Sequence, residues 1–166
     1  MHPMSEANRP ARPDLRRPHH LIAFGFGSGL APFAPGTFGT LLAIPIYLLL
    51  QSQPLPAYLT ILLGLFLIGI PICGRTSDDL GVHDHGGIVW DEVVGYLVTM
   101  SLAPPGWLWL VLGFLLFRLF DILKPWPIRW IDRRVSGGFG IMFDDLLAGL
   151  FALVVMQAIE LTGVIQ

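Results

Sequence analysis

The stretch GGIVWDEVVGYLVTM, residues 86–100, decides how the fold is interpreted. It is typical of an apolar helix, but it carries two adjacent carboxylates, Asp91 and Glu92, near its start. A carboxylate at the centre of a membrane helix costs about 2.5 to 3.5 kcal/mol on insertion scales, and less in the first turn, where the helix dipole favours negative charge. Helix-end electrostatics explains one acid better than two, because neighbouring side chains point about 100° apart. We therefore interpret the pair as functional.

The composition of the chain indicates an integral membrane protein. Of the 166 residues, 54% are apolar and 13% are charged, and the mean hydropathy is +0.67. Soluble domains are typically about 25% charged. A net charge of −2 and a pI near 6.2 provide no basic surface for nucleic acid, so we expect no nucleic-acid partner.

Apolar segments predict an all-α fold, a polytopic membrane helical bundle with about five spans. The segments are 38–50, 57–73, 88–103, 107–120 and 145–162. Most are shorter than the ~20 residues that cross a bilayer comfortably, so their ends must extend into flanking residues. Residues 20–50 form either one span or a partly re-entrant one, because glycines and prolines interrupt them. We expect residues 1–18 to be a disordered basic cytoplasmic tail and residues 19–166 a single membrane-embedded helical catalytic domain.

The distribution of basic residues predicts the orientation. They lie at the N-terminus and in the loops after the second and fourth predicted spans, whereas the loops 51–56 and 103–106 carry no charge. The positive-inside rule then places the N-terminus in the cytoplasm. Nearly every ionisable residue meets the same face, so we expect cytoplasmic-face loops to form the site.

The segment FRLFDILKPWPIRWIDRR, residues 117–134, mixes acids and bases with aromatic residues. One interpretation is a membrane anchor, in which cations contact anionic lipids and tryptophans fix the depth. It leaves Asp121 and Asp132 unexplained, because acids weaken the attraction to an anionic surface. The mixture suits a phosphate bound together with a metal ion. The residues concerned are Arg118, Asp121, Lys124, Arg129 and Asp132.

Two glycine-rich segments precede apolar helices. In SGGFGIMFDDLLAG, residues 136–149, Gly138 lies in a loop that resembles a phosphate cradle, and Asp144 and Asp145 open the last span. Either aspartate alone could simply cap the helix. Two carboxylates would repel a phosphate unless Mg²⁺ bridged the carboxylate and phosphate oxygens. In the segment 27–41, Gly36 and Thr37 either hold a headgroup phosphate or form a re-entrant turn capped by the threonine.

Four motifs resemble the phosphatidylglycerophosphatase A family of bacterial lipid phosphatases: LAPFAPGTFGTL (30–41), GIVWDEVVGY (87–96), FDILKPWPIRWIDRRVSGG (120–138) and GFGIMFDDLLAG (138–149). The resemblance runs from about residue 20 to residue 162. It implies a helical, multi-pass, Mg²⁺-dependent enzyme of the bacterial inner membrane. Such an enzyme removes the terminal phosphate of phosphatidylglycerophosphate and leaves phosphatidylglycerol, and the distribution of charge places its active site at the cytoplasmic face.

Combining the motifs with this chemistry gives the expected site. The catalytic set is Asp91, Glu92, Asp121, Lys124, Asp144 and Asp145, and of these Asp91, Glu92, Asp144 and Asp145 are expected to hold Mg²⁺. The residues expected to bind the phosphate are Arg118, Arg129, Thr37, Gly36 and Gly138. The nucleophile is either water activated by the metal or a carboxylate that attacks phosphorus directly. The alternative function is a small membrane carrier or channel for a divalent cation or phosphate, which predicts charge throughout the membrane depth.

Overall fold

Helices form all the regular structure in the part of the chain that this computed structural model describes, residues 12–82 and 85–164. No strand occurs within these ranges, so the all-α prediction is confirmed for them. The helices are α1 (Pro18–Ala23), the short 3₁₀ helix η2 (Gly25–Leu30), α2 (Pro35–Leu50), α3 (Leu55–Leu80), α4 (Trp90–Thr99), α5 (Trp107–Leu123), α6 (Ile128–Asp132) and α7 (Gly137–Leu161).

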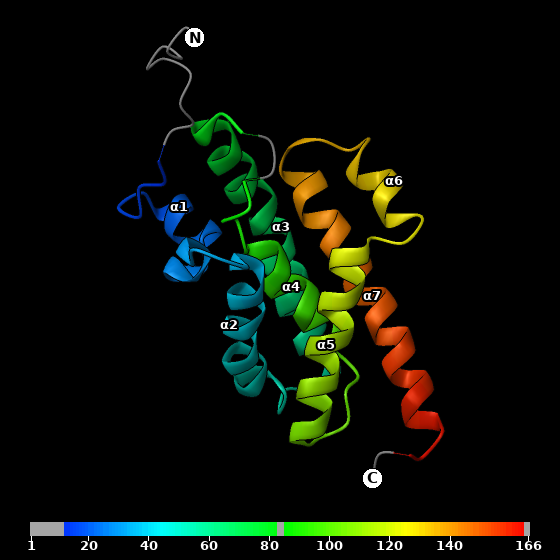
Figure 1. The fold of residues 1–166 in the computed structure, drawn as a ribbon. Helices are drawn as coiled ribbons and strands as arrows, with labels where there is room; N and C mark the ends of the chain where they lie inside the picture. Colours follow the sequence, from blue (N-terminus) through cyan, green and yellow to red (C-terminus); the bar gives the residue numbers. More distant parts are fainter. Residues whose placement is uncertain (1–11, 83–84, 165–166) are drawn as a thin grey trace, which may run out of the picture.

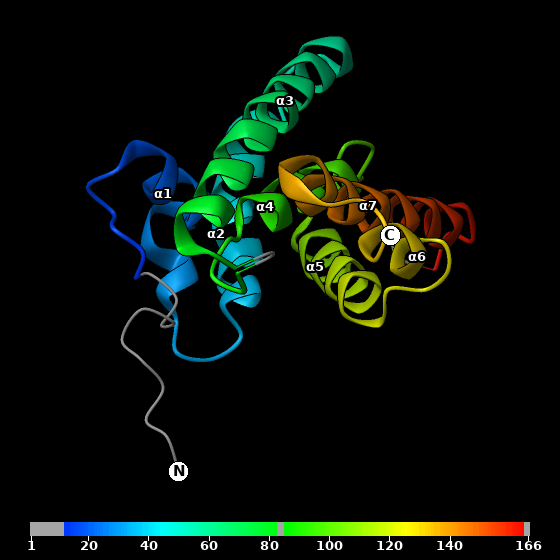
Figure 2. The same cartoon turned by 90° about the horizontal axis from the view of Figure 1, so that it is seen from above.

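The short helix α4 lies at the centre of the bundle. It contacts α2, α3, α5 and α7, and the surrounding helices enclose it in both views (Figures 1 and 2). Every residue of α4 except Glu92 is buried. A helix that is apolar on nearly all sides must be covered on all sides, which explains this central position. At 10 residues α4 is about 15 Å long, so it is too short to cross a bilayer alone.

The structure supports two spanning helices rather than establishing five. By length and composition, α3 with 26 residues and α7 with 25 residues could each cross a membrane. Helix α2 is apolar but has only 16 residues, and α5 has 17. Each of the five predicted apolar segments overlaps a helix of the bundle, but the predicted number of spans is not confirmed.

Glycines allow α7 to approach its neighbours closely. A side chain at Gly149 would collide with the backbone carbonyl of Gly95 on α4, and one at Gly138 would collide with the carbonyl of Ile70 on α3. Small residues allow helix backbones to approach in this way. The hydroxyl of Thr99 also donates to the Gly149 carbonyl oxygen at 3.3 Å, which links α4 to α7.

The charged loops and the C-terminus lie at opposite ends of the bundle. Helices α1 and α6, the end of α3 and the start of α7 are at one end, and the end of α7 is at the other (Figure 1). The first 11 residues of the predicted tail lie outside the described residues. Within residues 12–18, Arg17 donates to Asp79 of α3 at 2.7 Å, so this part of the predicted tail contacts the bundle.

Candidate functional site

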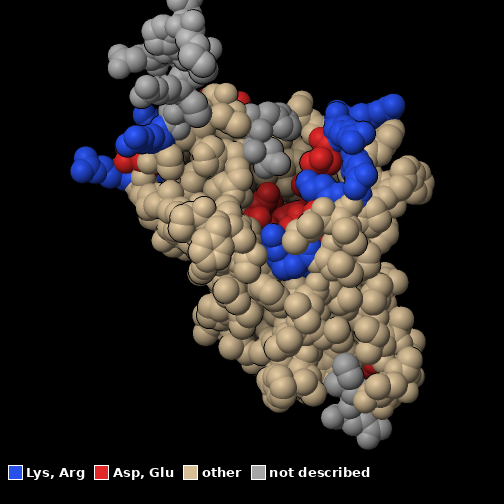
Figure 3. Space-filling view, in the orientation of Figure 1, with Lys and Arg blue, Asp and Glu red and all other residues tan. Residues whose placement is uncertain are grey.

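Three carboxylates converge between α4 and α7. Asp91, Glu92 and Asp145 each place one oxygen within 4.8 Å of the others. We call these three residues the carboxylate cluster. Figure 3 shows acidic side chains inside a hollow on this face of the molecule, with basic side chains around them. Sequence reasoning placed all three residues among the expected metal ligands.

Close packing of three helices positions the carboxylate cluster. The contact between Gly95 and Gly149 brings α4 and α7 together a short distance from Asp91 and Asp145. Helix α2 approaches from another side, because a side chain at Gly36 would collide with a carboxylate oxygen of Glu92. Gly36 was predicted to bind phosphate, and the structure places it at the cluster.

Arg118 of α5 lies beside the carboxylate cluster and forms an ion pair with Glu92. Its guanidinium donates to Asp121 at 2.5 Å, one turn along the same helix, and lies 3.7 Å from Glu92. Its Nε is buried and has no hydrogen-bond partner among the described residues. Asp121 therefore holds Arg118 beside Glu92, and the two predicted residues form one unit with the cluster.

The donor set of the carboxylate cluster fits a divalent cation. Two buried oxygens, Glu92 Oε2 and Asp145 Oδ2, have no hydrogen-bond partner in the described residues. Buried polar atoms are normally paired, so these oxygens lack the partner that burial requires. Mg²⁺ prefers oxygen ligands and binds through carboxylates. A single adjacent arginine, itself paired with Asp121, does not balance three carboxylates.

Asp144 does not belong to the carboxylate cluster, although it was predicted as a metal ligand with Asp145. Its Oδ2 accepts from Lys124 Nζ at 2.5 Å, and the same ammonium donates to Asp132 at 2.8 Å. Burial alone would lower the pKa of Lys124, but the charges and hydrogen bonds of Asp144 and Asp132 outweigh it and raise the pKa above its ordinary value. Lys124 therefore remains charged at neutral pH and links α6 to α7.

A basic pocket of about 500 Å³ adjoins the site at Lys124. We call it the arginine pocket. Arg134 stacks on Trp130 with its guanidinium carbon 4.5 Å from the ring centre, and Arg129 donates to the Leu123 carbonyl oxygen at 3.0 Å. Sequence analysis predicted Arg129 and Lys124 but overlooked Arg133 and Arg134. The lining residues are Lys124, Pro125, Trp126, Arg129, Trp130, Arg133 and Arg134.

Two further residues predicted to bind phosphate lie elsewhere. The N–H of Thr37 donates to the Ala34 carbonyl at 2.9 Å in the first turn of α2, and its side chain is half-buried. Gly138 packs against the backbone of α3 at Ile70 and Gly74. The structure thus gives both residues a role in packing or helix initiation, and their roles in phosphate binding stay predictions.

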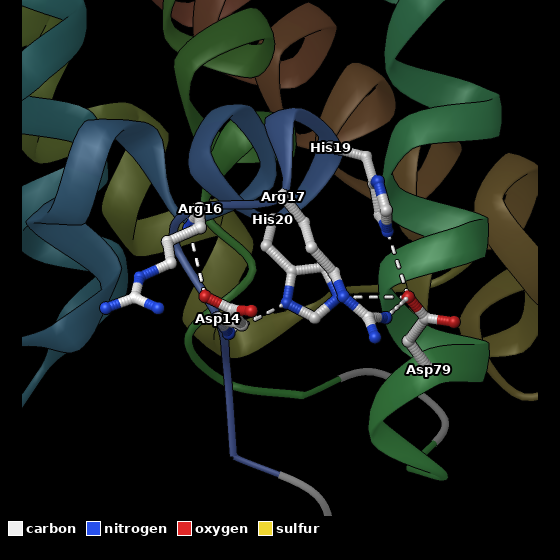
Figure 4. Close-up of polar contacts among 6 residues, drawn as sticks. All are labelled: Asp14, Arg16, Arg17, His19, His20 and Asp79. Atoms are coloured by element: carbon white, nitrogen blue, oxygen red, sulfur yellow. Dashed lines mark hydrogen bonds and ion pairs between the residues drawn. The ribbon is translucent and has the colours of Figure 1, made fainter.

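A second group of possible metal ligands lies near the N-terminus. The Nε2 atoms of His19 and His20 are 2.9 and 3.2 Å from one oxygen of Asp79, and Arg17 donates to the same oxygen (Figure 4). The N–H of Asp14 donates to His20 Nδ1 at 3.0 Å, so the neutral ring carries its proton on Nε2 and donates to Asp79. This group attaches the N-terminal segment to α3.

Comparison with known proteins identifies relatives over nearly the whole chain. Residues 21–160 match the family model described as phosphatidylglycerophosphatase A. A protein of this name from Escherichia coli (strain K12) is 49% identical over 144 residues, which cover 86% of this chain and 83% of that protein. Another from Haemophilus influenzae is 45% identical over 159 residues, 95% of this chain and 98% of that protein.

A more distant relative has a different name. A protein from Bacteroides thetaiotaomicron, provisionally named a phosphatidylinositol-3-phosphatase, is 39% identical over 153 residues, 86% of this chain and 95% of that protein. No solved structure matches the chain. The chain belongs to the phosphatidylglycerophosphatase A family, which is a family of phosphatases.

Proposed function

We propose that the protein hydrolyses phosphatidylglycerophosphate to phosphatidylglycerol and inorganic phosphate, with Mg²⁺, at the cytoplasmic face of the bacterial inner membrane. The observation that carries the proposal is the carboxylate cluster, in which Glu92 Oε2 and Asp145 Oδ2 are buried without a hydrogen-bond partner among the described residues, beside a pocket of cations. Acids that hold a metal and bases that hold phosphate are what phosphate-ester hydrolysis requires. The names of two relatives supply the substrate.

The residues of the carboxylate cluster would hold Mg²⁺ in this mechanism. Asp91, Glu92 and Asp145 are the proposed ligands, because their oxygens converge. Glu92 Oε2 and Asp145 Oδ2 also have no hydrogen-bond partner in the part of the chain that the structure describes. Bound Mg²⁺ would supply positive charge to the phosphate oxygens. Asp144 lies outside this group of three, since Lys124 donates to its Oδ2, and its role as a metal ligand stays a prediction.

The cations would position the terminal phosphate. Arg118, fixed by Asp121, faces the site from α5, and Lys124 faces it from the end of that helix. These two cations would stabilise the charge that develops on the phosphate oxygens during transfer. The phosphorus–oxygen bond to the terminal glycerol breaks, and the leaving oxygen takes a proton. Water is the preferred nucleophile. A carboxylate that attacks phosphorus is the alternative, and hydroxylamine would trap the acyl phosphate it forms as a hydroxamate.

The proposed position in the membrane agrees with the exposure of apolar side chains. On α3, Leu63, Leu67 and Ile68 are each more than half exposed, which lipid would cover. At the charged end, Trp126 is 81% exposed beside the arginine pocket. Tryptophan is enriched at the level of lipid headgroups. The pocket would then lie at the depth of the substrate phosphates.

The test of this function is the release of inorganic phosphate from phosphatidylglycerophosphate by the purified, detergent-solubilised full chain. Assays are run with Mg²⁺ and with a chelator, and phosphatidic acid is the second substrate. We expect Mg²⁺-dependent release from phosphatidylglycerophosphate and its loss in Asp91→Asn. Absence of release from either lipid, with folded and metal-replete protein, would contradict the proposal and make the carrier or channel the function to test.

A further inference from the structure

The carboxylate cluster and the arginine pocket are neighbouring but chemically opposite sites. The cluster consists of three acids, with Arg118 as its adjacent cation. The arginine pocket has three arginines and Lys124, which connects it to Asp144, the residue next to Asp145 of the cluster. A single phosphate does not need both sites, because the proposed Mg²⁺ and Arg118 would already offset its charge at the cluster.

The guanidinium groups of the arginine pocket are available to a ligand. Arg129, Arg133 and Arg134 are exposed, and none of them forms an ion pair with an acid of the described residues. Arg129 uses one N–H on a backbone carbonyl, and Arg134 stacks on Trp130 and keeps its edge open. A guanidinium has five N–H donors and suits phosphate oxygens. The neighbouring acid, Asp132, is paired with Lys124.

We infer that the arginine pocket binds the phosphodiester of the substrate while the terminal phosphomonoester lies at the carboxylate cluster. This inference rests on the proposed function. Phosphatidylglycerophosphate has both groups, joined through glycerol, whereas phosphatidic acid has the monoester alone. The assignment follows from charge: the monoester must lie at the metal ligands, and the pocket, which adds only cations, remains for the second anion. The pocket thereby favours lipids with two phosphates.

The experiment measures how Arg133→Ala changes the inhibition of the full-length enzyme in mixed micelles of a non-ionic detergent. The side chain of Arg133 is exposed and forms no ion pair with an acid of the described residues, so its removal should leave the fold intact. Phosphatidylglycerol, which keeps only the diester, and phosphatidic acid, which has only the monoester, serve as competitive inhibitors. We expect the KM for phosphatidylglycerophosphate and the Ki for phosphatidylglycerol to rise together by about tenfold. The Ki for phosphatidic acid and kcat should change less than about twofold.

The matched control is Arg75→Ala, which removes an exposed cation of α3 that lies outside the arginine pocket. This control should leave both inhibition constants unchanged. If Arg133→Ala raised the Ki for phosphatidylglycerol and the Ki for phosphatidic acid equally, or left the KM for phosphatidylglycerophosphate unchanged, the inference would be overturned and the proposed function would stand. No turnover by the wild-type enzyme would overturn both. Arg133→Gln serves as the second variant if thermal unfolding shows that Arg133→Ala is unstable.

Discussion

Asp145 is one of the three carboxylates of the cluster. Repulsion among these carboxylates destabilises the metal-free fold, although the proposed site needs all three to hold a metal. Replacing Asp145 by Asn removes one of three like charges within 4.8 Å and keeps the shape of the side chain. We expect Asp145→Asn to lower kcat at least about a hundredfold, because losing even an outer partner of a metal site costs 10- to 100-fold. We expect the melting temperature of the metal-free variant to exceed that of the wild type. Thermal unfolding in detergent and phosphate release measure the two effects.

The control for this prediction is Glu160→Gln, an exposed acid near the end of α7. It should change neither activity nor melting temperature. Added Mg²⁺ should raise the melting temperature of the wild type and of the control, but not that of Asp145→Asn, because ligand binding stabilises only a protein that binds it. A Mg²⁺-dependent shift that survives in Asp145→Asn would remove this residue from the metal ligands.

Lys124 supports the site by pairing with Asp144, which is buried. In Lys124→Met, the buried carboxylate of Asp144 loses its ion pair with Lys124. We expect the free energy of unfolding to fall by about 2 kcal/mol. Adding Asp144→Asn should recover most of that loss, because the buried charge is then gone. Neither variant should recover activity. Denaturant unfolding of the two single variants and the double variant completes the cycle. Additive losses would show that the pair is not coupled.

For single residues, the sequence predicts which side chains belong to the site but not the direction in which each one points. Asp144 and Asp145 look equivalent in the sequence, yet consecutive helical positions point about 100° apart, so Asp145 meets α4 and Asp144 meets Lys124. The same argument fails for Asp91 and Glu92, which both reach the cluster. Glu92 has one more methylene than Asp91, and its longer side chain can reach an oxygen position that backbone direction alone does not predict.

The contact between α4 and α7 sets the geometry of the carboxylate cluster, so it should be sensitive to one methyl group. In Gly149→Ala the new Cβ collides with the Gly95 carbonyl and crowds Val98 at 3.0 Å. The helices must separate, which moves Asp145 away from Asp91. We expect a loss of about 1 to 3 kcal/mol of stability and at least about a tenfold loss of kcat.

The matched variant is Gly64→Ala on α3, where a new Cβ meets nothing within 4 Å. Alanine is favoured over glycine inside a helix by about 0.8 to 1.0 kcal/mol, so this change should be neutral or stabilising and should leave activity unchanged. Unfolding and phosphate-release assays are performed on both variants together. Equal behaviour of the two variants would show that the α4–α7 contact does not control the site.

Sequence predicts the existence of the long helices better than their ends or their partners. The segment 57–73 corresponds to a helix that continues to Leu80, because apolar content stops before helical structure does. The segment 88–103 corresponds to a helix that ends at Thr99. The arginine pocket was overlooked because α6, with five residues, has no periodic pattern of its own. Arg133 and Arg134 follow Arg129 by four and five residues, so they come together with it only once this short helix has formed.

For the whole molecule, the location of charged residues along the bundle distinguishes an enzyme from a carrier or channel. The arginine pocket lies at α6, at one end of the bundle, and Lys124 connects it to Asp144, the residue next to Asp145 of the cluster. The exposed acid Glu160 lies near the end of α7, at the other end (Figure 1). A carrier or channel needs polar groups throughout its depth. In the central stretch of α3, from Tyr58 to Gly74, the described side chains include no charged residue. This distribution favours catalysis at one membrane face.

A spanning bundle predicts that its two ends face opposite sides of the membrane. Ser136, between α6 and α7, and Thr162, just after α7, are exposed at the two ends of that 25-residue helix. Cys73 is buried and is replaced by alanine so that it cannot interfere. We expect Ser136→Cys to react with a membrane-impermeant maleimide only in inverted vesicles, and Thr162→Cys only in intact spheroplasts. Reaction of both from the same side would mean that the bundle lies on the membrane rather than across it, and the carboxylate cluster would then need another route to its lipid.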